Sequence, residues 1–184
     1  MTATTLDPNT ALVLIDLQKG IAALPTAHPA AEVIARGARL AAAFRERGLP
    51  VVLVNVTGGA PGRTEGPARA DNPPADWADL VPELGRQPSD LLVTKKTWGA
   101  FHGTALDMEL RRLGVTQIVL GGIATSIGVE STARSAYEHG YHVTVATDAV
   151  TDMDAAAHDN SVEKIFPRLG ETDTTDAILK LLAS

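Results

Sequence analysis

Residues 117–128 read Gln-Ile-Val-Leu-Gly-Gly-Ile-Ala-Thr-Ser-Ile-Gly, an aliphatic run that passes through two glycines into a helical pattern. The run predicts a strand over 117–121, and the pattern after it predicts a helix over 126–139 that ends at Gly140. Near-continuous aliphatic strands are typical of parallel sheets, because such sheets are buried on both faces. The stretch therefore favours an α/β fold in which strands alternate with helices.

The same alternation continues on both sides of this stretch. Aliphatic runs predict strands at 11–16, 51–56, 91–94 and 141–146, and a short strand with few apolar residues is expected near Glu171. Apolar residues at helical spacing predict helices at 29–47, 104–113, 154–166 and 174–182. Right-handed crossovers place the carboxyl ends of all these strands at one edge of the sheet. The sequence therefore predicts a single domain, residues 1–184, with a three-layer Rossmann-like fold: a mostly parallel sheet with helices on both faces.

Composition excludes several classes of protein. The chain has no cysteine, which excludes disulfide scaffolds, thiolate metal sites and a cysteine nucleophile. A net charge of −6 argues against a nucleic-acid-binding surface. The longest apolar runs fall far short of the roughly 20 residues that a membrane span needs, and Met1–Pro8 lacks the basic and apolar regions of a signal peptide. We therefore expect a cytoplasmic protein that binds neither nucleic acid nor membranes.

The segment from Thr57 to Asp90 is unusual, because its 34 residues are rich in glycine and proline. Connections of this length in compact domains commonly serve as lids over a site or as interaction segments. Residues 77–80 predict a short helix within it. Trp77 and Trp98 are candidates for an interface or for covering a neighbouring site, and the alternative for each is ordinary packing.

Candidate functional residues follow the predicted strands, since ligands of open α/β sheets bind beyond the strand carboxyl ends. Asp16 ends an aliphatic run, where burial raises the pKa of a carboxyl group and suits it to acid–base catalysis; the alternative is a turn-capping role. The side chains of Lys95 and Lys96 start on opposite faces of the strand, so at most one of them points into a pocket. The alternative is that both are solvated at the strand end. The helix that starts in 121–128 offers its free backbone N–H groups to an anion or an oxyanion. The alternative is that the side chain of Thr125 or Ser126 caps the helix.

Other familiar motifs are missing. The glycines of 121–128 do not have the spacing of a dinucleotide-binding loop, and residues 58–64 lack the Gly-Lys-Ser/Thr ending of a P-loop. No Gly-x-Ser-x-Gly elbow supports a serine hydrolase. The acidic residues of 152–159 together with His158 are interpreted as a helix start rather than a metal site. The sequence therefore predicts no metal and no cofactor.

Four stretches taken together resemble the isochorismatase-like hydrolases, a superfamily that includes nicotinamidases and N-carbamoyl amide hydrolases. They are Leu14-Ile-Asp-Leu-Gln18, Lys95-Lys-Thr-Trp-Gly-Ala-Phe101, Gly121-Gly-Ile-Ala-Thr-Ser-Ile-Gly-Val-Glu-Ser-Thr132 and Thr147-Asp-Ala149. The ordered match spans about residues 10–183. The resemblance implies a six-stranded parallel sheet and a small-molecule site at the strand carboxyl ends. The segment 57–90 contains no histidine, which argues against a metal-dependent nicotinamidase.

The resemblance also implies a mechanism. Most members use an Asp, a Lys and a Cys; Asp16 and Lys95 match the first two, and Gly128 stands at the Cys position. Thioester chemistry requires a thiolate, which this chain lacks. Isochorismatases hydrolyse a vinyl ether without a thiol, so the resemblance implies that Asp16 protonates the enolpyruvyl methylene, water attacks, and pyruvate leaves. Lys95 would then orient a substrate carboxylate, and Arg63 or Arg69 would add a second cation.

Further site residues are implied by the same resemblance. A cis peptide between Ile123 and Ala124 turns the Ala124 N–H, with that of Gly128, toward the pocket. The substrate contacts expected are Gln18, Trp98, Ile123, Thr125 and Arg63. The resemblance also implies a homo-oligomer, a dimer or a tetramer. Two alternatives stay open: a non-catalytic protein that only binds a small molecule, and an amide hydrolase in which Asp16 activates water.

Overall fold

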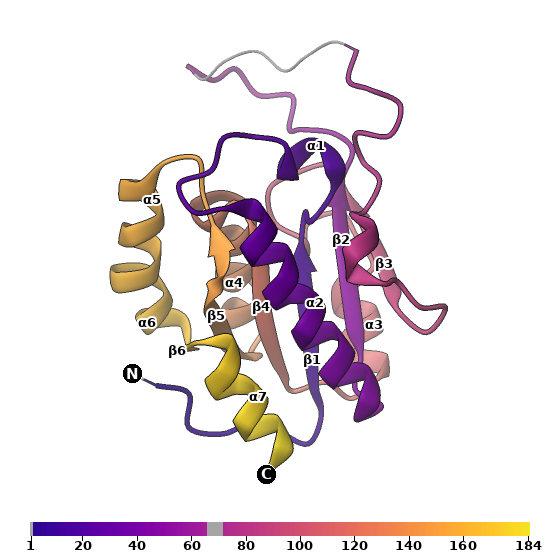
Figure 1. Ribbon diagram of the computed structural model, residues 1–184, viewed down its shortest axis with the longest axis vertical. Helices are drawn as coiled ribbons and strands as arrows, with labels where there is room; N and C mark the ends of the chain where they lie inside the picture. Colours follow the sequence, from indigo (N-terminus) through magenta and orange to yellow (C-terminus); the bar gives the residue numbers. More distant parts are fainter. Residues whose placement is uncertain (1, 66–71) are drawn as a thin grey trace.

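The computed structural model describes residues 2–65 and 72–184 of the chain (Figure 1). Its centre is one six-stranded sheet in the order β3-β2-β1-β4-β5-β6, and every neighbouring pair is parallel. The predicted six-stranded α/β fold is therefore confirmed, including the short strand near residue 171. The strands are β1 (Thr10–Ile15), β2 (Val51–Val56), β3 (Leu91–Lys95), β4 (Gln117–Ile123), β5 (His142–Thr151) and β6 (Glu171–Asp173).

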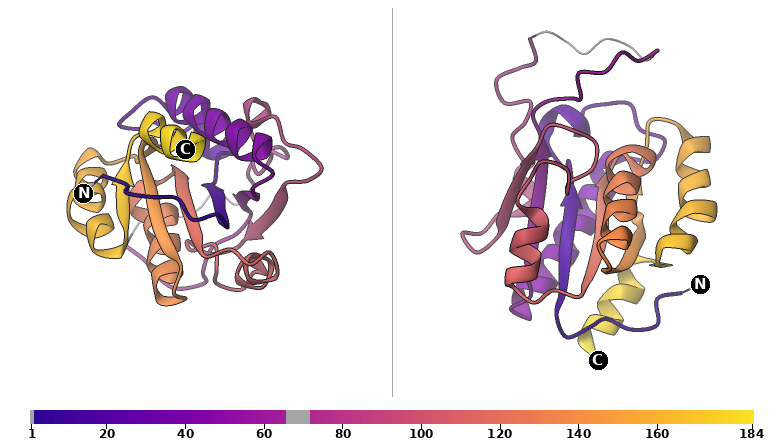
Figure 2. Two further views of the ribbon diagram at one scale, coloured as in Figure 1. Left: turned by 90° about the horizontal axis from the view of Figure 1, so that it is seen from below. Right: turned by 180° about the vertical axis from the view of Figure 1, so that it is seen from behind.

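Helices cover both faces of the sheet, as the buried strands require. Alternate residues of β1 point to opposite faces: Ala11, Val13 and Ile15 join one apolar cluster, and Leu12 and Leu14 join the other. The first cluster packs against α3 (Leu106–Arg112), α4 (Glu130–Glu138) and α6 (Phe166–Leu169). The second packs against α2 (Ala30–Glu46) and α7 (Thr175–Ala183), which lie together on one side in Figure 2.

Three predicted helices differ in detail from the structure. The helix expected over 126–139 begins with a π-helical turn, η2 (Thr125–Val129), before α4. The helix expected over 154–166 is divided into α5 (Ala155–Asn160), the π-helical turn η3 (Ser161–Ile165) and α6. The short helix expected at 77–80 is wrong: the chain turns there, Leu80 forms an isolated β-bridge with Gln18, and a 3₁₀ helix, η1, follows at Pro82–Leu84.

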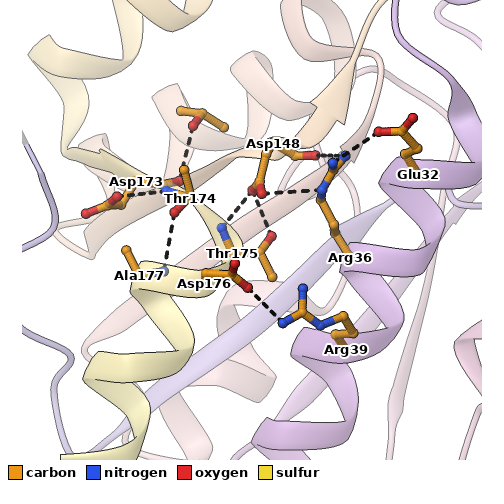
Figure 3. Close-up of polar contacts among 10 residues, drawn as sticks. Glu32, Arg36, Arg39, Asp148, Asp173, Thr174, Thr175, Asp176 and Ala177 are labelled. Carbon is orange, nitrogen blue, oxygen red and sulfur yellow. Dashed lines mark hydrogen bonds and ion pairs between the residues drawn. The ribbon is translucent and has the colours of Figure 1, made fainter.

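The motif Thr147-Asp-Ala149 ties three elements together (Figure 3). Asp148 Oδ1 accepts hydrogen bonds from the backbone N–H of Thr175, at 2.7 Å, and from its hydroxyl, at 2.8 Å. On the α2 side, Arg36 donates to the Asp148 carbonyl at 3.1 Å and places Nε 3.4 Å from Asp148 Oδ2. Asp148 therefore fastens the start of α7, and α2, to the middle of β5.

The carboxyl ends of β1, β2 and β3 meet at the edge of the sheet that also carries α1 (Lys19–Ala22) and the start of the long segment after β2 (Figure 1). None of the helices in the described residues is both long and apolar enough to cross a membrane. This edge is where the sequence places the functional residues.

Candidate active site

A buried ion pair lies at this edge of the sheet. Asp16 directly follows β1 and Lys95 is the last residue of β3, so the two come from strands on either side of β2. Lys95 Nζ lies 2.7 Å from Asp16 Oδ2, and only 2% of Lys95 and 5% of Asp16 is exposed. Lys95 Nζ also donates to the Thr97 carbonyl at 3.2 Å. The neighbouring Lys96 is exposed, so one of the two lysines faces inward, as their alternation predicts.

A cavity of about 180 Å³ opens beside the pair. Asp16 and Lys95 form part of its wall, together with Ile123 and Ala124, which are joined by a cis peptide bond as expected. Trp98 lines the mouth and is 63% exposed. The remaining lining residues are mostly apolar: Ile21, Val56, Thr97, Ile127, Gly128 and Met153.

Gly128 faces the ion pair from η2. An ideal Cβ on Gly128 would lie 3.3 Å from Asp16 Oδ2 and 3.5 Å from Lys95 Nζ. The same Cβ would lie only 2.9 Å from Ile15 Cγ2. A side chain at position 128 would therefore enter the space between the acid, the amine and the strand β1.

Comparison with known proteins agrees with this geometry. The isochorismatase domain model matches residues 10–177. The chain belongs to the isochorismatase family. It is 44% identical to the isochorismatase family protein YwoC of Bacillus subtilis over 178 residues, covering 93% of both chains. It is also 44% identical to the family protein YecD of Escherichia coli O157:H7 over 182 residues, covering 94% of this chain and 96% of YecD.

A solved structure of an isochorismatase family protein from Burkholderia thailandensis has the same fold. It superposes with a TM-score of 0.94 at 45% identity and covers 98% of both chains. The protein is thus an isochorismatase-family hydrolase, and its ion pair and cavity lie where the sequence predicted the substrate site.

The carboxylate of Asp152 holds the turn η2, which lines the cavity, in place. The sequence predicted Asp152 only as part of a helix start. Asp152, which follows β5 and is 2% exposed, accepts hydrogen bonds from Ser126 through one oxygen. The distances are 2.7 Å from the Ser126 N–H and 2.8 Å from its hydroxyl. The alternative that Thr125 or Ser126 caps the helix is therefore wrong, since neither side chain makes a capping bond and the Asp152 carboxylate accepts from the Ser126 N–H instead. Its position at a strand carboxyl end was the available signal.

His158 supports the same loop from behind the cavity. Its Nδ1 lies 2.9 Å from Thr125 Oγ1, and its ring lies 4.7 Å from the ring of His28. Burial lowers the pKa of His158 below its usual value, and the nearby His28 lowers it further. Thr125 is completely buried and does not line the cavity, which contradicts its expected role in substrate binding.

Two more expected substrate contacts are not at the cavity. Gln18 is completely buried, and its amide bonds to the backbone of Val56 and to the Trp77 carbonyl, so it fastens the long segment to β2. Arg63 is exposed and does not line the cavity. Arg69, the other expected cation, lies outside the described residues. Within residues 2–65 and 72–184, no group of three or more His, Asp or Glu side chains is placed to hold a metal ion.

Proposed function

We propose that this hydrolase cleaves a vinyl ether by the isochorismatase type of reaction, with Asp16 as general acid and without a thiol nucleophile. The observation that carries the proposal is the buried Asp16–Lys95 pair beside a cavity whose facing residue is Gly128. The chain contains no cysteine that could form a thioester. Acid catalysis needs only a proton donor and a water molecule, and this site provides the donor.

The reaction balances with Asp16 as its only acid–base group. The protonated carboxyl group of Asp16 gives its proton to the terminal carbon of the vinyl ether, which leaves an oxocarbenium ion. Water adds to the positive carbon and returns a proton to the Asp16 carboxylate, so a hemiketal forms and the acid is regenerated. The hemiketal then collapses to a ketone and an alcohol. Pyruvate is that ketone when the substrate carries an enolpyruvyl group.

Lys95 and the backbone around Gly128 support these steps. The Lys95 ammonium stabilises the Asp16 carboxylate left after proton transfer, because the two groups stay in contact in a buried site. The N–H groups of Ala124 and Gly128 stabilise the hemiketal oxygen as it forms. Two influences on Asp16 oppose each other, since burial favours the protonated acid and Lys95 favours the carboxylate. Only the protonated acid can donate to carbon, so the proposed reaction requires the effect of burial to outweigh that of Lys95.

The amide hydrolase alternative rests on the same ion pair. An ammonium 2.7 Å from Asp16 favours the ionised carboxylate, which suits a base that activates water for attack on an amide. The binding-protein alternative rests on the absence of cysteine and predicts saturable binding with no product.

One small probe separates all three functions. α-Methoxyacrylamide contains a vinyl ether and an amide in the same molecule, so methanol release reports ether cleavage and ammonia release reports amide hydrolysis. In heavy water, proton transfer from Asp16 to carbon should place one deuterium in the methyl group of the product. We expect Asp16→Asn to lower methanol release by at least about a hundredfold. Undiminished release by this variant, or no release from any vinyl ether, charged or uncharged, would disprove the proposal.

A further inference from the structure

Asp152 connects three segments of the chain beside the cavity. It directly follows β5 and is 2% exposed. One carboxylate oxygen, Oδ2, accepts both hydrogen bonds from Ser126 in η2. The other, Oδ1, accepts from the N–H groups of Met153, at 2.8 Å, and Asp154, at 3.4 Å. The Asp152 carbonyl accepts from the N–H of Ala27 at 2.7 Å, which fastens the chain that follows α1 to the same point.

Each of these segments adjoins or carries part of the cavity wall. Gly128 lies in η2, Met153 directly follows Asp152, and Ile21 lies in α1. Asp152 itself does not line the cavity, so it acts on a substrate only through its neighbours. We infer that Asp152 is a positioning residue, whose hydrogen bonds place η2 against the buried ion pair for the chemical step. This inference rests on the proposed function, in which backbone N–H groups at η2 stabilise the hemiketal oxygen.

Ser126 transmits the effect of Asp152 to those N–H groups. Ala124 lies two positions before Ser126, and Gly128 lies two positions after it. The N–H groups of Ile127 and Val129 both bond to the Ala124 carbonyl, at 3.2 and 3.1 Å, and link the two ends of the turn. A shift of Ser126 therefore displaces the N–H groups of both Ala124 and Gly128 from the place where the oxygen forms.

The four donors around Asp152 require an acceptor on both sides of the group. A carboxylate accepts through both oxygens, whereas an asparagine amide presents N–H donors on one side. In Asp152→Asn the amide oxygen can face either Ser126 or Met153, and the other segment loses its acceptor. In Asp152→Ala both segments lose it. We therefore expect a larger effect from alanine than from asparagine at this position.

Turnover of α-methoxyacrylamide tests the positioning role, with Asp154→Ala as a matched control. Asp154 also accepts from backbone N–H groups, but it is exposed and caps α5. Loss of one oxyanion donor costs about 10²–10³ in kcat, so we expect Asp152→Ala to lower kcat at least about tenfold. KM should change by less than about threefold, because these N–H groups act on an oxygen that forms in the transition state. Asp154→Ala should leave both constants within about twofold. Equal losses of kcat in the two variants, or a rise in KM alone, would overturn the inference.

Amide hydrogen exchange separates failure of this inference from failure of the proposed function, because it needs no substrate. We expect Asp152→Ala to speed exchange of the Ser126 and Met153 N–H groups at least about tenfold, with α2 unchanged and no such effect in Asp154→Ala. If the parent protein releases no methanol, faster exchange in Asp152→Ala supports the positioning of η2 while the proposed reaction fails. Unchanged exchange overturns the inference whether or not the parent protein is active.

The isosteric variant keeps the test decisive if Asp152→Ala does not fold. Asp152→Asn then replaces it in both measurements. We expect kcat to fall at least about threefold and exchange to rise at Ser126 or at Met153, since one side of the group loses its hydrogen bonds. An unchanged kcat with unchanged exchange at both N–H groups would contradict the inference.

Discussion

Replacing Gly128 by alanine should destabilise the folded protein, although alanine usually stabilises a helix by about 0.5–1 kcal/mol relative to glycine. The new Cβ would lie 2.9 Å from Ile15 Cγ2, which is closer than real Cβ contacts. Ile15 is completely buried and β-branched, and its strand pairs with β2 and β4, so it cannot move aside easily. Overpacking of this kind costs about 1–3 kcal/mol. We therefore expect Gly128→Ala to lower the free energy of unfolding despite its helix preference.

A double-mutant cycle isolates the contact. Urea unfolding is measured for the parent protein, Gly128→Ala, Ile15→Ala and the double variant. Removing Cγ2 from Ile15 makes room for the new methyl, so Gly128→Ala should be nearly neutral in that background, with a coupling of at least about 1 kcal/mol. Gly62→Ala serves as a control, because a Cβ there meets nothing within 4 Å. A neutral or stabilising Gly128→Ala in the parent protein, or independent effects of the two changes, would refute the reasoning.

Three further predictions concern stability and follow from charge and hydrogen bonding. Asp16→Leu or Lys95→Met alone should cost about 3–5 kcal/mol by removing one member of a buried ion pair, whereas the double variant should cost less than the sum in urea unfolding; equal or additive effects would contradict a coupling between the two charges. Because the pKa of His158 is lowered in the folded protein, the unfolded chain binds more protons below about pH 6.5, and stability should fall as pH drops. His158→Asn should reduce this loss when urea midpoints at about pH 7.5 and about pH 5 are compared; an unchanged loss would contradict the assignment. Asp148→Ala should cost about 1–3 kcal/mol in thermal or urea unfolding, because Thr175 loses two hydrogen bonds, and a neutral result would show that α7 is held by packing alone.

The fold follows from the sequence because the same few physical constraints repeat along it. Strands buried on both faces are predominantly aliphatic, and the runs at 11–15, 51–54 and 118–120 show this directly. Helices on both faces then cover the sheet. The spacing of apolar residues did not predict the π-helical turns η2 and η3. Both turns contact other elements of the fold, and such contacts are not visible in the sequence. In η2 these include the bonds from Asp152 and His158.

The contacts of several side chains near the cavity were not predictable from the sequence. Gln18 and Thr125 lie close to the cavity in sequence, but both point into the protein, where their polar atoms bond to Val56 and His158. Buried polar groups must find partners, and those partners come from distant segments that sequence spacing does not reveal. Arg63 was expected at the cavity as a second cation from the long segment, and charge does not determine where an exposed residue lies.

The meeting of Asp16 and Lys95 depends on strand order rather than on either residue's neighbours. In the register of the sheet, Ile15 aligns with Val54, and Val56 aligns with Lys95. Asp16 therefore follows β1 one step short of the level of Lys95, two strands away, which is about 10 Å at the usual strand spacing. A lysine side chain can cross most of that gap over the end of β2, whereas a shorter basic group could not. Had β3 and β1 not flanked β2, the same two residues would have remained separate, and the chain would have had no buried acid–amine pair at its cavity.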